Sequence, residues 1–79
     1  EQGSMIIAVS KDGEVWIDNN KIELNAVRSH VEREHAQNPE GTIIILADQN
    51  SRTGTTVEVL DQVRLAGVTN VSIAASNEQ

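Results

Sequence analysis

Histidine and acidic side chains stand close together in one stretch of the chain, at a spacing that suggests metal binding. His30 and His35 lie on either side of Glu34 in a stretch with helical periodicity, superficially like a helical zinc motif. That motif places its histidines four positions apart, whereas His30 and His35 are five positions apart, so they diverge by about 140° around a helix. His30 and Glu34 have a suitable spacing, but two ligands make a poor zinc site. We therefore predict neither a metal site nor a cofactor.

Asp48 is the strongest single candidate for a functional side chain. It follows the apolar run 43–47 and so lies at the carboxyl end of an expected strand, where open parallel sheets gather their ligands. One alternative is therefore a small-ligand site centred on Asp48 and Arg52. The other is that Asp48 organises the loop 49–53, as aspartate often does in turns. We favour Asp48 as a loop organiser.

The sequence contains no nucleophile elbow, phosphate-binding loop or glycine-rich dinucleotide turn. Gly54 stands alone near the expected strand–helix junction, although Arg52 and the neighbouring threonines could bind an anion at a helix start. The sequence offers no base or nucleophile that would pair with Asp48 for catalysis. We therefore predict that the chain is not an enzyme.

Size and charge narrow the class of protein further. The 79 residues suit one small domain, whose core must come from 8 Ile, 9 Val and 4 Leu, with Trp16 as the sole aromatic residue. Without cysteine there is no disulfide, so a partner chain would help stability. The net charge of −6 argues against nucleic acid as a partner. No apolar run approaches the roughly 18–20 residues that a membrane span needs.

The elements that must position these residues follow from periodicity. Alternation and apolar runs predict strands at 5–10, 14–18, 42–47 and 71–75, with a short extra stretch at 21–22. Apolar residues three and four apart predict helices at 24–37 and 53–66. The order β-β-(β)-α-β-α-β predicts an α+β two-layer sandwich, in which two helices cover one face of a mixed sheet.

Several local features refine this prediction. The nearly unbroken apolar run 42–47 is typical of a central strand buried on both faces. Thr53 is the expected N-cap of the second helix, and Gly67 is expected in the left-handed conformation after it. If both helices lie on one face, aliphatic side chains and Trp16 remain on the other. They would be covered by loops or form an interface with a subunit or partner.

The last strand is the best candidate for binding a partner. It carries no charge and no proline, so at a sheet edge its backbone could pair with another chain. The predicted partner-binding residues are Val71, Ser72, Ile73, Ala74 and Ala75. The N-terminal strand could serve in the same way if it is an edge. Alternatively, the tail shields the edge.

The expected extent of the domain is 6–75. Residues 1–5 are expected to be the remnant of an expression tag and the start of the first strand, and residues 76–79 a C-terminal tail.

Three stretches resemble the periplasmic domain of the ExbD/TolR family. Residues 45–48, Ile-Leu-Ala-Asp, and residues 57–68, which end in Ala-Gly-Val, are similar to a strand and helix of that family. Residues 12–18 resemble its hairpin, with Trp16 at the usual aromatic position, and Pro39 before the central strand is also typical. The resemblance covers about 6–74. Family members often carry tyrosine where Thr53 stands, which leaves the contact of such a tyrosine in doubt.

The resemblance implies a role in energy coupling. Full-length members are inner-membrane proteins with one membrane helix and a periplasmic domain. They join an ExbB- or TolQ-like channel subunit in a motor driven by the proton-motive force. The motor energises TonB for outer-membrane uptake or TolA for envelope integrity. The proton-carrying aspartate belongs to the membrane helix, which these 79 residues do not include.

For this domain the resemblance therefore implies recognition rather than the proton step. The implied partners are a second copy in a homodimer, a TonB- or TolA-like protein, the channel subunit through the membrane helix, and, in the TolR branch, peptidoglycan. Acidic charge and a single aromatic residue weaken the peptidoglycan alternative, because sugars stack on aromatic rings. The choice between the ExbD and TolR branches stays open.

Overall fold

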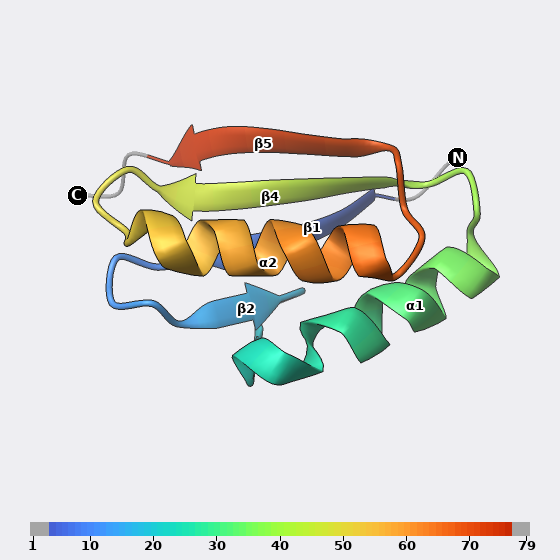
Figure 1. The fold of residues 1–79 in the computed structure, drawn as a ribbon, viewed down its shortest axis with the longest axis horizontal. Coiled ribbons are helices and arrows are strands. Elements are labelled where there is room, and N and C mark those ends of the chain that lie inside the picture. The colour runs from blue at the N-terminus through green and yellow to red at the C-terminus, as the bar shows by residue number, and fades with distance from the viewer. Residues whose placement is uncertain (1–3, 77–79) are drawn as a thin grey trace.

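The structure, a computed structural model, describes residues 4–76 of the chain (Figure 1). Its elements are β1 (Ser4–Val9), β2 (Val15–Ile17), β3 (Asn20–Ile22), a 3-10 turn (Leu24–Ala26), α1 (Val27–Gln37), β4 (Thr42–Asp48), α2 (Thr53–Leu65) and β5 (Val71–Ser76). The predicted order of elements is confirmed, including the third strand that the sequence indicated only weakly. Of the expected tag remnant and strand start 1–5 and the expected tail 76–79, residues 1–3 and 77–79 lie outside the described residues. Ser4 and Met5 belong to β1, and Ser76 belongs to β5 rather than to a tail.

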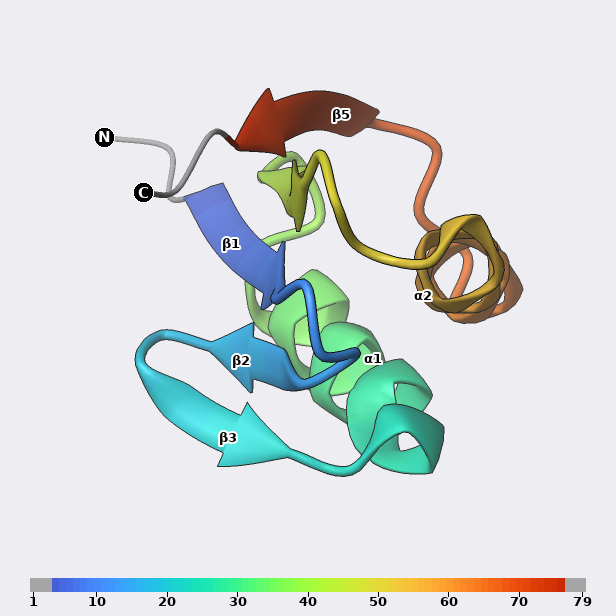
Figure 2. The ribbon, with the colours of Figure 1, turned by 90° about the vertical axis from the view of Figure 1, so that its left-hand side faces the viewer.

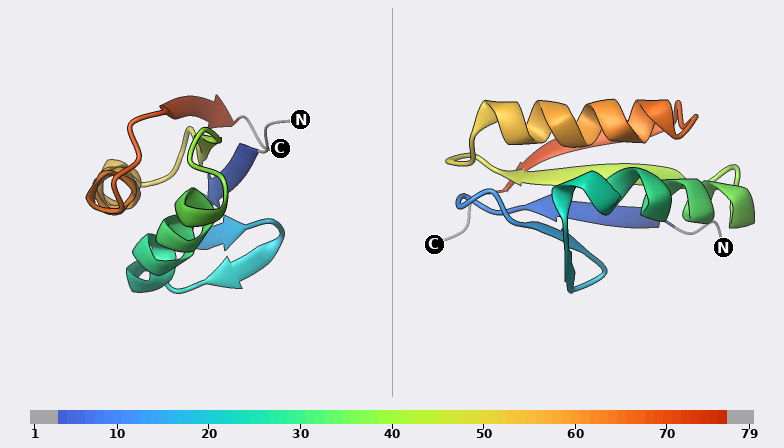
Figure 3. Two further views of the ribbon diagram at one scale, coloured as in Figure 1. Left: turned by 90° about the vertical axis from the view of Figure 1, so that its right-hand side faces the viewer. Right: turned by 60° about the horizontal axis from the view of Figure 1, so that its bottom comes forward.

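The five strands form one open sheet in the order β3-β2-β1-β4-β5. β1 pairs with β4, and β4 with β5, in parallel, whereas the β1–β2 and β2–β3 pairs are antiparallel. Both helices lie on the same side of this sheet (Figures 2 and 3). The predicted α+β fold with a mixed sheet is therefore confirmed.

The core lies between the sheet and the two helices. Because side chains alternate along a strand, each central strand turns every second residue toward the helices. The register places Ile7 beside both Ile17 and Ile45, and these side chains are at most 4% exposed. The helices contribute four valines with no exposed surface: Val27, Val31, Val59 and Val63. A narrow row of valines on each helix therefore covers the inner face of the sheet.

The prediction that the apolar run of β4 is buried on both faces is wrong. Ile43 and Ile45 are buried under the helices, but Ile44 and Leu46 on the opposite face are only half-buried. β4 has a neighbouring strand on each side, as expected, yet both helices cover the same face. An apolar run on such a strand therefore leaves half of its side chains on the open face.

The ends of α2 fit the sequence in one respect and correct it in another. Thr53 is not the N-cap, because it is already the first helical residue, and the extended Arg52 (φ −71°, ψ 131°) precedes it without a side-chain capping bond. Gly67 has φ +94°, which confirms its predicted left-handed conformation. Its N–H donates to the Arg64 carbonyl at 2.9 Å and ends the helix.

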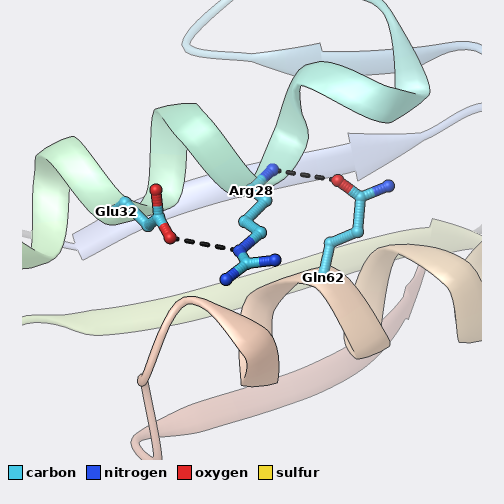
Figure 4. Close-up of polar contacts among 3 residues, drawn as sticks. All are labelled: Arg28, Glu32 and Gln62. Atoms are coloured by element: carbon cyan, nitrogen blue, oxygen red, sulfur yellow. Dashed lines mark hydrogen bonds and ion pairs between the residues drawn. The ribbon is translucent and has the colours of Figure 1, made fainter.

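A glutamine joins the two helices where α1 lacks a cap of its own (Figure 4). Ala26 occupies the N-cap position of α1 and offers no side-chain acceptor. The Arg28 N–H instead donates to Gln62 Oε1 at 3.0 Å, and Gln62 Nε2 donates to the Leu24 carbonyl at 2.7 Å. Gln62 therefore gives the Arg28 N–H an acceptor that the start of α1 lacks, and it is a second donor to the Leu24 carbonyl, which also accepts the Val27 N–H. This fixes one helix against the other.

Candidate functional site

β5 forms one edge of the sheet, as its predicted role requires. It is six residues long, carries neither charge nor proline, and pairs with β4 alone. Val71 is half-buried, whereas Ser72, Ile73, Ala74 and Ala75 are exposed. A long, uncharged edge of this kind is a template for a further strand. Whether a partner uses these five residues stays a prediction.

The register identifies which backbone groups of β5 are open. In a parallel pair a residue bonds to the two neighbours of its opposite residue. Val71 lies opposite Ile43, whose N–H donates to the Asn70 carbonyl at 3.0 Å. The peptide groups of Ser72 and Ala74 therefore face β4. Those of Val71, Ile73 and Ala75 point away from the sheet, where an added strand would find them.

The opposite edge is much less suited to pairing. β3 has only three residues, Asn20–Ile22. Its central residue, Lys21, lies 3.3 Å from Glu14 Oε2 in an exposed ion pair. Short edge strands and edge lysines are devices that discourage pairing with other chains. β5 is therefore the more accessible of the two edges.

The suggestion that the N-terminal strand is also an edge is wrong. β1 lies between β2 and β4, and Ile7–Val9 have a partner strand on both sides. Each of its six residues lies opposite a residue of β4 in the register that runs from Ser4–Thr42 to Val9–Ala47. No second strand-pairing site as long as β5 is expected there.

Asp48 lies at the carboxyl end of β4, where it was predicted, and shapes the turn that follows. Its side chain is 7% exposed, and its Oδ1 accepts the Asn50 N–H at 2.8 Å. The Ser51 N–H donates to the Asp48 carbonyl, also at 2.8 Å. No ion pair joins Asp48 to Arg52, which is exposed. This geometry favours a loop organiser over a ligand site.

We expect Asp48→Ala to lower the free energy of unfolding by about 1–2 kcal/mol, because the part-buried hydrogen bond from the Asn50 N–H loses its acceptor. Asp48→Asn retains a side-chain oxygen that can accept this hydrogen bond, so it should lower the free energy of unfolding by less. Urea denaturation of the three proteins measures both changes. Unchanged stability in Asp48→Ala would contradict the loop role and revive the ligand-site alternative.

The open face of the sheet carries an apolar patch made by side chains of three neighbouring strands. Ile6 is 45% exposed, and Ala8, Trp16, Ile44 and Leu46 are half-buried. The register lines Ile6 with Ile44 and sets Ala8 between Trp16 and Leu46. This patch is the set of open-face side chains for which the sequence suggested either a cover of loops or an interface with a subunit or partner.

The histidines of α1 do not come together in a metal site. Among residues 4–76 no group of three histidine, cysteine or acidic side chains is placed to hold an ion. His30 lines a hollow with Arg33 and Glu34 beside Asn20 and Ile22 of β3, and His35 is half-buried. In the same described range, neither α1 nor α2 is long and apolar enough to cross a membrane.

Sequence reasoning missed the surroundings of the β5 edge. Arg64 of α2 and Ile73 of β5 line one hollow on the helix side of the sheet. The two residues are nine positions apart, and no motif or periodicity links them. The exposed, uncharged strand was the available signal, but its neighbourhood depends on how α2 lies over the sheet.

Two comparisons place the chain among known proteins. The family model described as "Biopolymer transport protein ExbD/TolR" matches residues 1–78. The chain is also similar to biopolymer transport protein exbD2 of Vibrio cholerae serotype O1, with 27% identity over 75 residues. That alignment covers 95% of this chain and 56% of the Vibrio protein, so the chain spans little more than half of its relative. The family match covers nearly the whole chain, and the protein therefore belongs to the ExbD/TolR family of biopolymer transport proteins.

Proposed function

We propose that this chain is the periplasmic coupling domain of a complex driven by the proton-motive force, of the ExbB–ExbD–TonB or TolQ–TolR–TolA type. Its role is to bind the energy-transducing partner, a TonB- or TolA-like protein, by adding a strand of that partner to β5. The observation that carries this proposal is the edge itself, six residues without charge or proline. Family membership supports a role in biopolymer transport.

The remaining parts of the proposal follow from the same family. The domain is anchored in the bacterial inner membrane through a segment outside this chain, and that segment contacts the ExbB- or TolQ-like channel subunit. The domain does no chemistry itself. Asp48, the one buried acidic side chain in the described part of the molecule, is engaged by the backbone of its own loop. A second copy of the chain is a further partner, and in a homodimer it would compete for the same edge.

Amide hydrogen exchange followed by NMR tests the strand addition residue by residue. In the free domain, Ser72 and Ala74 should exchange slowly, because their N–H groups face β4, whereas Ile73 and Ala75 should exchange fast. Peptides that tile the periplasmic segment of a TonB- or TolA-like protein from the same organism should protect Ile73 and Ala75. Ser72 and Ala74 serve as internal controls within the same strand.

Two other outcomes have distinct meanings. A peptide that binds without slowing exchange at Ile73 and Ala75 would show that the partner docks elsewhere, and the proposal would fail. Protection that exists without peptide and disappears on dilution would show that a second copy occupies the edge. Partner peptides must then displace that copy for the proposal to hold, which analytical ultracentrifugation of the mixture measures.

A further inference from the structure

A hollow of about 460 Å³ lies beside the β5 edge, on the helix side of the sheet. Leu60 and Arg64 of α2 line it from one side, and Val71 and Ile73 of β5 line it from the other. The chain segment 67–69, which joins α2 to β5, closes one end. A strand added to β5 would therefore run along this hollow.

The exposure of Ile73 shows that the helix layer stops short of the sheet edge. Ile73 lies opposite Ile45 and faces the same side, yet Ile45 has no exposed surface and Ile73 is 53% exposed. Val57, which is 55% exposed, precedes Leu60 by three residues and so continues the apolar flank of α2. Apolar side chains on the helix side of an added strand would cover these surfaces.

Arg64 gives the hollow a charge preference. It is the one charged side chain among the residues that line the hollow. Within residues 4–76 it forms no ion pair, whereas Arg28 and Lys21 are paired with Glu32 and Glu14. Arg64 lies in the last turn of α2, close to the point where β5 begins. A carboxylate of the partner could therefore reach an unpaired guanidinium at this end.

We infer that the hollow selects an extended segment that runs antiparallel to β5, with apolar side chains at alternate positions facing α2 and an acidic residue after them that pairs with Arg64. The inference rests on the proposed function, because it needs β5 to accept a strand. Antiparallel pairing is slightly more stable than parallel pairing. An antiparallel segment ends beside the start of β5, which places its last residues near Arg64.

Designed peptides test this selection independently of any natural partner. The probe is acetyl-Thr-Val-Thr-Val-Thr-Asp-amide, in which both valines and the aspartate share one face. One matched control replaces the aspartate with asparagine. The other, acetyl-Thr-Val-Val-Thr-Thr-Asp-amide, has the same composition but places its valines on opposite faces. Dissociation constants come from NMR titrations that follow the Ile73 and Ala75 amides.

We expect the asparagine peptide to bind about threefold more weakly, the change expected from an exposed ion pair. The Arg64→Gln variant should show the same loss with the aspartate peptide and no further loss with the asparagine peptide. The Arg52→Gln variant removes an exposed arginine just before α2 and should change nothing. The peptide with its valines on opposite faces should bind about tenfold more weakly, because one valine loses its buried position.

Equal affinity for all three peptides would overturn the inference and leave strand addition at β5 intact. The inference also fails if natural partner peptides protect Ile73 and Ala75 while none of the designed peptides binds. By contrast, partner peptides that bind without touching β5 would overturn the proposed function itself. The two failures are therefore distinguishable.

Discussion

Replacing Ile45 with alanine should lower the free energy of unfolding by about 3–4 kcal/mol. Ile45 has no exposed surface and lies between β1 and β5 on the face that the helices cover. Removing its branched side chain leaves a cavity that the surrounding valines cannot fill without moving. For a small domain with a total stability of about 5 kcal/mol, this is most of the margin.

The neighbouring residue provides the matched control. Ile44 has the same side chain on the same strand but faces the open side of the sheet and is only half-buried. Ile44→Ala should therefore lose about 1 kcal/mol. Urea denaturation followed by circular dichroism compares both variants with the parent. Equal losses would contradict the one-sided core and would mean that the open face is also packed.

The second large effect concerns proline in β5. Ala75→Pro should weaken binding of a partner strand by about tenfold or more, because it removes an outward N–H and places a ring where the incoming backbone must lie. The stability of the free domain should change little, since that N–H makes no bond to β4. Exchange-based binding assays and urea denaturation measure the two quantities separately.

Ala74→Pro is the control one position away. Its N–H faces β4, so proline there removes a ladder bond and should cost about 3 kcal/mol of stability. If Ala75→Pro destabilises the fold as much as Ala74→Pro does, the assignment of outward and inward groups is wrong. If Ala75→Pro binds partner peptides as well as the parent does, strand addition at β5 is wrong.

Local patterns were sufficient to predict the elements and their order. Val15–Ile17 alternate, and valines of α2 fall four positions apart. Both patterns involve residues that are close in the sequence, so the type of each element could be predicted from the sequence directly. Gly67 was readable for the same reason, because a left-handed residue after a helix strongly favours glycine. The capping role assigned to Thr53 failed because a one-residue shift of the helix start leaves the sequence pattern almost unchanged.

The arrangement of elements that are distant in the sequence was harder to predict, and it determines which residues surround the candidate site at β5. The apolar run of β4 suggested burial on both faces, but burial depends on where the helices of distant segments lie. Likewise, nothing local says that β1 is inserted between β2 and β4. The candidate strand 71–75 was found because its composition suits an edge. The hollow beside this strand and the role of Arg64 could not be predicted, because both depend on where α2 lies over the sheet.

The parallel pairing of β4 with both β1 and β5 also has a consequence for folding. β1 pairs with residues 38 positions later, from Ser4 to Thr42, so on the ribosome it must wait for the middle of the chain to emerge. Pairings between such distant residues form slowly, and unpaired strands are prone to aggregation meanwhile. β5 follows the other four strands of this sheet in the sequence and pairs with β4 alone. The proposed docking edge therefore forms only after the other four strands have been synthesised, so a chain that still lacks β5 has no such edge to offer a partner.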